Sequence, residues 1–212
     1  MQHKEVSKSV LKRLPVYLAY LKNIPDDGAA YISATALANA LGMGEVQVRK
    51  DLAMVSDGGR PKIGYLRESL IEDISQFLGY DNTTDAILVG AGKLGQALLG
   101  YSGFDAYGLN ILAAFDAAPV ADKTEDGKPI LPMNQMESFC RDNKILMGII
   151  TVPAAYAQQV CDQMIACGIQ AIWTFAPVHL EVPENILVQN ENMATSLAVL
   201  SMHLQAQIKE KK

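Results

Sequence analysis

A hexapeptide rich in glycine is the part of the sequence best suited to hold a phosphate group. It has the pattern G-x-G-x-x-G and consists of Gly90, Ala91, Gly92, Lys93, Leu94 and Gly95. The pattern follows an apolar run at 86–89 and opens an amphipathic segment, so it marks a turn from a strand into a helix. Gly90 permits the tight turn, Gly92 lets a pyrophosphate approach the backbone, and Gly95 lets helix and strand pack closely. Free N–H groups at the helix N-terminus would then bind the phosphates.

An acidic residue follows at the distance that a dinucleotide site requires. Asp116 ends the next apolar run, 21 residues after Gly95. A carboxylate there accepts hydrogen bonds from the adenosine ribose and repels a 2′-phosphate, so we expect NADH and NAD+ as cofactors in preference to their phosphorylated forms. The alternative is a structural glycine turn and a strand-end aspartate without a ligand.

Two further tripeptides end later apolar runs of the same region. They are Thr151, Val152 and Pro153, and Phe175, Ala176 and Pro177. Ligands of open α/β sheets bind at the carboxyl ends of the strands, which makes both tripeptides candidates for the cofactor site. Ordinary strand-ending prolines explain them equally well, and the spacing leaves both interpretations open.

Groups that would catalyse a reaction are scarce. Of the three histidines only His179 falls near a strand end, and there is no Tyr-x-x-x-Lys sequence. The three cysteines are an odd number without a C-x-x-C pair, which argues against a zinc site or a disulfide framework and for a reducing cytosol. The sequence therefore predicts no metal and no catalytic residue, and favours a sensor over an enzyme.

The elements around this site alternate in type. Half of the 212 residues are apolar, and apolar runs occur at 86–89, 111–115, 145–152, 169–175 and 186–188 with amphipathic segments between them. This order predicts a parallel sheet with helical crossovers. No apolar run approaches the roughly 18 residues of a membrane span, so no membrane partner is expected.

The N-terminal region predicts helices instead. Leucines recur at helical spacing at 14–21, where Pro15 would start or kink a turn. Ser33 is placed to cap a helix over 34–41 that ends at Gly42, and a second helix is expected at 45–55. Two short helices joined by a tight glycine turn indicate a helix-turn-helix, although spacing alone does not decide this.

The second of these helices has two different faces. Val48, Leu52 and Val55 form the apolar one; the other is predicted to hold Gln47, Lys50, Asp51 and Met54. The basic, glycine-rich stretch 58–65 is typical of a β-hairpin wing, and an apolar stripe over 66–78 predicts a connecting helix. Residues 1–77 carry 10 basic against 9 acidic residues and the remainder 8 against 14, so the composition leaves nucleic-acid binding open.

The last predicted helix, at about 192–208, needs a partner for its apolar face. That face consists of Met193, Leu197, Leu200, Leu204 and Ile208. The helix could pack on its own domain. Alternatively it could form a homodimer, whose two-fold symmetry would suit a helix-turn-helix protein that binds two half-sites.

Several short segments, taken together, resemble one family. They are Arg13-Leu14-Pro15-Val16-Tyr17-Leu18, Gln47-Val48-Arg49-Lys50-Asp51-Leu52, Gly64-Tyr65, the hexapeptide followed by Tyr101, Ala113-Ala114-Phe115-Asp116, Thr151-Val152-Pro153-Ala154 and Phe175-Ala176-Pro177-Val178. Over about residues 8–207 the chain resembles the Rex family of redox-sensing transcriptional repressors.

The resemblance implies an α/β protein of three parts. These are a winged-helix DNA-binding domain at 1–79, a Rossmann-type NAD(H)-binding domain with a parallel sheet at 80–190, and a domain-swapped dimerisation helix at 191–212. It implies a cytoplasmic homodimer that binds double-stranded operator DNA. NADH would close the dimer and release the DNA, whereas NAD+ would bind without expelling it.

The resemblance also assigns roles to residues. Lys50 would reach base edges, Phe175 would lie near the nicotinamide, and Tyr101 would take part in switching. The expected DNA contacts are Arg13, Ser33, Gln47, Arg49, Lys50, Arg60, Lys62 and Tyr65.

The chain departs from the family pattern at two places. Where the family continues the recognition helix with Phe-Gly-Glu-Phe-Gly, this chain has the stretch Met-Val-Ser-Asp-Gly-Gly at 54–59. Where the family often has an aspartate that partners the switch tyrosine, this chain has Asn192, which can accept a hydrogen bond but carries no charge.

Two other functions remain as alternatives. The chain could be an NAD-dependent oxidoreductase whose N-terminal helices form a dimerisation arm. It could also be a nucleotide-binding domain of the CoA-ligase type, which shares the glycine-rich α/β architecture, although Asp116 favours a dinucleotide.

Overall fold

The chain folds as two compact units. The computed structural model describes residues 6–25, 28–119, 121–124 and 126–210. One unit is Met1–Asn82 together with Ala106–Gly108, and the other is Thr83–Asp105 together with Leu109–Lys212.

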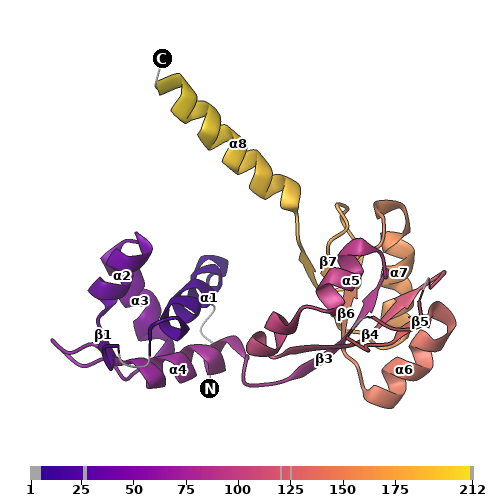
Figure 1. Ribbon diagram of the computed structural model, residues 1–212, viewed down its shortest axis with the longest axis horizontal. Helices are drawn as coiled ribbons and strands as arrows, with labels where there is room; N and C mark the ends of the chain where they lie inside the picture. Colours follow the sequence, from indigo (N-terminus) through magenta and orange to yellow (C-terminus); the bar gives the residue numbers. More distant parts are fainter. Residues whose placement is uncertain (1–5, 26–27, 120, 125, 211–212) are drawn as a thin grey trace. The chain divides into compact units, whose positions relative to one another are not determined.

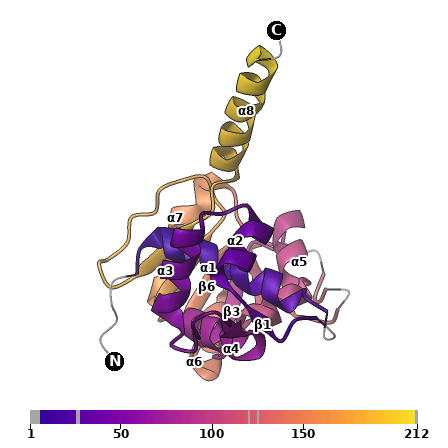
Figure 2. The same cartoon turned by 90° about the vertical axis from the view of Figure 1, so that its left-hand side faces the viewer.

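The first unit is built from helices and a short two-stranded sheet (Figure 1). Its elements are α1 (Lys8–Lys22), β1 (Tyr31–Ile32), α2 (Ala34–Leu41), α3 (Glu45–Val55), β2 (Tyr65–Leu66) and α4 (Arg67–Leu78). Both predicted helices of the helix-turn-helix are confirmed, with the predicted bounds. The Ser33 side chain accepts from the Ala36 N–H at the start of α2, and Gly42 ends α2 in the left-handed conformation. Figure 2 shows the same elements after a quarter turn about the vertical axis.

The predicted wing is present as a tight hairpin. Arg60 and Gly64 exchange two backbone hydrogen bonds of 2.9 Å, and Lys62 lies at the tip with a φ of 65°. The residues that follow the hairpin form β2, which pairs antiparallel with β1. The unusual 54–59 stretch is therefore compatible with a wing.

The core of the first unit joins all four helices. Leu14, Leu18, Leu52 and Ile74 are each almost completely buried in it. Pro15 lies inside α1 and does not begin it, which corrects one of the two possibilities that the sequence left. A helix can continue past proline when other contacts hold it, and here the leucines on both sides of Pro15 are buried.

The second unit is a six-stranded parallel sheet. Its strands are β3 (Thr84–Val89), β4 (Leu109–Asp116), β5 (Ile130–Pro132), β6 (Met147–Ile150), β7 (Ala171–Thr174) and β8 (Leu187–Asn190). They lie in the order β5-β4-β3-β6-β7-β8, with the order reversing beside β3. This is the doubly wound order of dinucleotide-binding folds, so the predicted α/β class is confirmed. β5 was not predicted, because a strand of only three residues leaves no distinct apolar run in the sequence.

Helices cover both faces of this sheet. α6 (Met136–Asn143) and α7 (Ala154–Ala166) pack on one face, where Ile87, Phe115 and Ile150 are buried. α5 (Lys93–Leu99) and the short 3-10 helix η1 (Ser102–Tyr107) pack on the other, against Leu88 and its neighbours. The alternation of buried side chains along β3 fixes which residues reach each face.

The last helix, α8 (Met193–Glu210), keeps its apolar side chains exposed. Leu197, Leu200 and Leu204 retain 63%, 65% and 54% of their accessible surface. The Asn192 Oδ1 atom accepts from the Thr195 N–H at 3.1 Å and so caps the start of the helix. None of the helices among the described residues is both long and apolar enough to cross a membrane.

Candidate functional site

The glycine-rich hexapeptide forms the turn between β3 and α5. Gly90 has a φ of +106°, which favours glycine, and a Cβ atom on Gly95 would collide with the Gly90 carbonyl oxygen. A Cβ atom on Gly92, in contrast, would meet no protein atom within 4 Å. The packing of the protein does not require glycine at position 92, and the open space above it leaves room for a pyrophosphate to approach the start of α5.

Asp116 ends β4 and contacts this turn directly. Its Oδ2 atom accepts from the Ala91 N–H at 2.7 Å and its Oδ1 atom accepts from the Ala118 N–H at 2.9 Å. The carboxylate therefore holds the glycine-rich turn in place. Because a carboxylate can accept about four hydrogen bonds, acceptor capacity remains for ribose hydroxyls.

Thr151 supports the turn from the neighbouring strand. Its hydroxyl donates to the Gly90 carbonyl oxygen at 2.7 Å, and its backbone N–H donates to the Val89 carbonyl oxygen at 2.9 Å. This brings the ends of β3 and β6 together beside the point where the strand order reverses.

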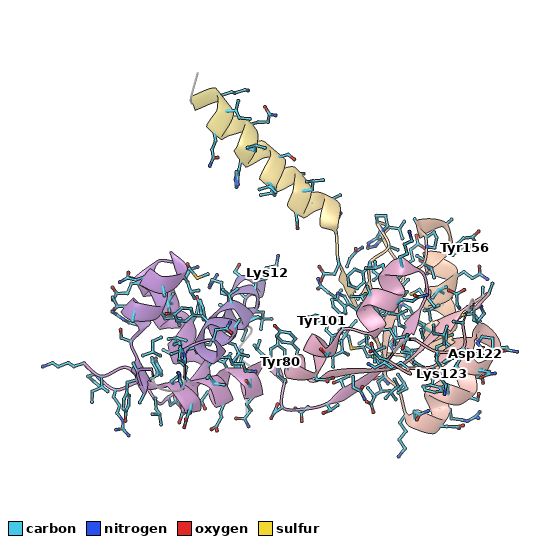
Figure 3. All side chains as sticks on the ribbon, viewed as in Figure 1. Lys12, Tyr80, Tyr101, Asp122, Lys123 and Tyr156 are labelled. Carbon is cyan, nitrogen blue, oxygen red and sulfur yellow. The ribbon has the colours of Figure 1, made fainter. Side chains whose placement is uncertain are left out.

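A cavity of about 590 Å³ lies at these strand ends. Its lining includes six predicted cofactor residues: Gly90, Gly92, Asp116, Thr151, Val152 and Pro153. Tyr156, Gln159 and Gln163 of α7 also line it, and these were missed (Figure 3 marks Tyr156). Their spacing of three and four residues directly after the Thr-Val-Pro tripeptide could have indicated one face of a helix at the site.

The remaining predicted cofactor residues are not among those that line this cavity. Phe175 packs its ring on Trp173, with the centroids 4.9 Å apart. Ala176 is buried and donates its N–H to the Thr174 hydroxyl at 3.2 Å. Ala91, Lys93, Leu94, Gly95 and Pro177 lie in the same two loops or in the first turn of α5, and their predicted contacts stay predictions.

The exposed face of α3 holds three of the eight predicted DNA contacts. Gln47, Arg49 and Lys50 are exposed, and Arg49 pairs with Glu45 one turn earlier. An open hollow beside this face is lined by Arg13, Gly44, Glu45, Val46, Gln47, Lys50 and Asp51.

The prediction that Asp51 belongs to this exposed face is wrong. Asp51 is only 3% exposed, and its carboxylate accepts from Arg13 Nε at 2.7 Å and from Arg13 Nη2 at 2.9 Å. The hydroxyl of Tyr17 donates to the same carboxylate at 2.8 Å. The arrangement ties α3 to α1, and the side-chain hydrogen bond to Asp51 raises the pKa of Arg13.

The other predicted DNA contacts occupy different places in the first unit. Arg60 and Lys62 are exposed on the wing, and the Ser33 hydroxyl caps α2. Tyr65 is buried, and burial raises its pKa. Its position favours a role in shaping the wing over the predicted contact with DNA.

The cysteines are poor candidates for a nucleophile. Cys140 and Cys161 are buried. Burial raises the pKa of Cys140 to about 11, and it also raises the pKa of Cys161 above its ordinary value. A thiol with a raised pKa holds little of the reactive thiolate near neutral pH. Within the ranges that the structure describes, no three His, Cys, Asp or Glu side chains gather as a metal site.

Two family models match separate parts of the chain. The model described as "Putative DNA-binding protein N-terminus" matches residues 5–53, and the model described as "CoA binding domain" matches residues 81–178.

Relatives match the chain over nearly its whole length. A protein of Porphyromonas gingivalis named "Redox-sensing transcriptional repressor Rex" is 40% identical over 92% of this chain and 90% of its own. A protein of the same name from Clostridium beijerinckii is 41% identical over 94% and 95%.

Solved structures show the same similarity. The protein RSP in complex with β-NAD+ and operator DNA has a TM-score of 0.88 and 32% identity over 98% of this chain and 96% of its own. RSP in complex with β-NADH has a TM-score of 0.85 and 32% identity over 99% and 100%.

Proposed function

The chain belongs to the Rex family of redox-sensing transcriptional repressors, and we propose that the cavity at the strand ends and the exposed face of α3 are the two sites through which it works. It is a DNA-binding repressor that senses the NADH/NAD+ balance. The observation that carries this conclusion is the match to named repressors across both units at once, because 94% of the chain is covered.

NADH and NAD+ would bind where β3 turns into α5. The turn at 90–95 and the N-terminus of α5 would hold the pyrophosphate, and Asp116 would accept from the adenosine ribose. Thr151, Val152 and Pro153, which line the cavity, would contact the ligand. From the family resemblance, Phe175 would lie near the nicotinamide. The two oxidation states supply a nicotinamide ring that is cationic in NAD+ and neutral in NADH, and this difference is what the site must distinguish.

Operator DNA would be bound by the first unit. Lys50 and Gln47, both exposed on α3, would reach base edges in the major groove. Arg49 on α3 and the wing residues Arg60 and Lys62 would contact phosphates or groove edges. Arg13 would contribute from α1, held in place by Asp51.

We place the protein in the cytoplasm as a homodimer. The exposed leucines of α8 support a partner helix, because such a stripe is costly to leave in water. Exchange of α8 with the partner, and a switch through Tyr101 and Asn192, follow from the family resemblance. In this scheme NADH favours a dimer that leaves the operator, and NAD+ does not.

The relatives are named as repressors, and on that ground the chain is a regulator and not the oxidoreductase of the first alternative. The match to a CoA-binding model supports the α/β architecture that NAD- and CoA-binding domains share. Competition between CoA and NADH for the protein decides between the two ligands, and we expect CoA not to displace NADH.

The proposal is tested by DNA capture on the immobilised full chain. We expect duplexes with roughly palindromic sites from the source genome to be retained with NAD+ and released by NADH. A Gly92→Ala variant should keep the melting temperature, because its new methyl group meets no protein atom, but should lose NADH-dependent release. Equal retention of DNA with NADH and NAD+ by the unaltered chain would contradict the proposal.

A further inference from the structure

Four aromatic side chains of the second unit form an unbroken row of ring contacts. Tyr101 packs edge-on against Phe104 with centroids 5.0 Å apart, and Phe104 packs edge-on against Trp173 at 5.8 Å. Trp173 then contacts Phe175 at 4.9 Å. The row runs from the residue before η1 to the loop after β7, and each ring is in contact with the next.

A hydrogen bond links the middle of this row to the segment before α8. The Trp173 Nε1–H group donates to Glu191 Oε1 at 3.1 Å. Glu191 lies two residues before α8 begins, and its own backbone N–H donates to the Thr174 carbonyl oxygen at 2.8 Å. The indole of Trp173 thus contacts both Phe175 and Glu191, which lies just before α8.

The side-chain bond is not needed to hold this junction together. The backbone bond between Glu191 and Thr174 already attaches the end of β8 to β7, and Asn192 already caps α8. A half-buried indole–carboxylate bond is therefore an addition to two other anchors.

The other end of the row lies beside η1. Tyr101 directly precedes η1, and the last residues of η1 belong to the first unit, where Tyr107 packs edge-on against Tyr80 at 5.2 Å. The row therefore begins next to η1 and, through Trp173 and Glu191, contacts the segment that precedes α8.

We propose that Trp173 and Glu191 are positioning residues that transmit occupancy of the nicotinamide end of the cleft to α8, and that their hydrogen bond supplies part of the coupling between NADH and DNA. This rests on the proposed function, in which Phe175 lies near the nicotinamide. A ligand shifts an equilibrium only by interacting differently with its two states, and the Trp173–Glu191 bond is a contact that can differ between them.

The test compares four single variants and one double variant of the full chain. Trp173→Phe keeps an aromatic ring but removes the donor, Glu191→Ala removes the acceptor, and Glu191→Gln keeps an acceptor oxygen without the charge. The matched control is Asn110→Ala, which removes another half-buried side-chain bond between parts of the same sheet, from Asn110 Nδ2 to Asp85 Oδ1 at 2.8 Å. Each protein is titrated with one operator duplex in NAD+ and in NADH, and the ratio of the two dissociation constants is the coupling factor.

We expect Trp173→Phe and Glu191→Ala each to lower the coupling factor about five- to tenfold, the range that corresponds to one such bond. DNA affinity in NAD+ and NADH affinity without DNA should stay within about twofold of the parent. Glu191→Gln should retain most of the coupling and Asn110→Ala all of it. The double variant Trp173→Phe/Glu191→Ala should be no worse than either single one, because both remove the same bond.

Other results would overturn the inference. Coupling factors equal to the parent in both single variants would show that the bond transmits nothing. Losses that add in the double variant, or a matching loss in Asn110→Ala, would assign the effect to general destabilisation. If the parent itself has the same DNA affinity in NADH and NAD+, the proposed function fails and this inference with it, whereas a responsive parent with unaffected variants rejects only the inference.

Discussion

Removing the carboxylate of Asp51 should destabilise the first unit and weaken DNA binding together. Asp51 is 3% exposed and accepts three hydrogen bonds, two from Arg13 and one from Tyr17. In Asp51→Ala the completely buried Tyr17 hydroxyl loses its acceptor, which costs about 1–3 kcal/mol. The Arg13 side chain is 19% exposed and can regain water, so its cost is below the roughly 3–5 kcal/mol of a fully buried broken ion pair. We expect the free energy of unfolding to fall by about 3 kcal/mol.

The assay can follow the two units separately. Trp173 is the only tryptophan of the chain and lies in the second unit, so its fluorescence follows that unit during urea denaturation. Circular dichroism follows the helices of both units. We expect Asp51→Ala to lower the urea midpoint of the helical signal while the tryptophan midpoint stays close to that of the parent.

Asp51→Asn is the matched control, because its amide oxygen still accepts from Tyr17. We expect it to cost about half as much, since it removes the charge opposite Arg13 but leaves no buried hydroxyl without a partner. Operator affinity should fall in the same order, with alanine lowest, because α3 and Arg13 lose their mutual anchor. A change below about 0.5 kcal/mol in Asp51→Ala, the range of ordinary surface substitutions, would refute the reasoning.

Three further predictions concern the cleft, the recognition helix and high pH. Asp116→Ala should weaken NADH binding about 10- to 100-fold and reduce the preference for NADH over NADPH, as measured by nucleotide titration. Asp116→Asn should lose only this preference. If both variants discriminate between NADH and NADPH as the parent does, the carboxylate does not face the ribose. Lys50→Ala should cost about 1–3 kcal/mol of operator affinity and relax base preference without changing NADH affinity; equal losses on all sequences would make Lys50 a phosphate contact. Burial, and next the hydrogen bond to Asp51, raises the pKa of Tyr17 from 10.0 to about 12, so the folded state holds this proton more tightly than the unfolded one. The stability that this group contributes below pH 10 should therefore be lost as the pH rises toward 12. The free energy of unfolding of Tyr17→Phe should depend less on pH over this window than that of the parent. The same pH dependence in both proteins would contradict the prediction.

Local signals explain why the helix-turn-helix could be predicted to the residue. Ser33 and Gly42 act within one turn of the helix ends that they fix, so their residue types alone specify α2. The hexapeptide is equally local, because Gly90 and Gly95 are required by a single strand–turn–helix connection. The parallel sheet could be predicted because most of its strands are apolar runs long enough to be recognised in the sequence.

Long-range partners explain what the sequence did not reveal. Asp51 is three residues after Val48 and therefore on the buried side of α3, but its polarity suggested the opposite. The compensating charge is Arg13, 38 residues earlier on another helix, and no local pattern reports such a pair. Tyr156 was missed for a related reason, since α7 reaches the cavity only because β6 and β3 are neighbours in the sheet.

The asparagine at position 192 can be explained by its role as the N-cap of α8. An N-cap needs a side-chain oxygen that accepts from the backbone, and Asn192 provides one for Thr195 as well as an aspartate would. The neutral residue therefore preserves α8 but removes a charge, while the adjacent Glu191 keeps a carboxylate and binds it to Trp173. A hundredfold response of DNA affinity to NADH needs a differential of about 2.8 kcal/mol. One indole–carboxylate bond can supply only part of this free energy, so we expect the remainder to come from the partner helix. Glu191→Ala should therefore lose only part of the coupling between NADH and DNA.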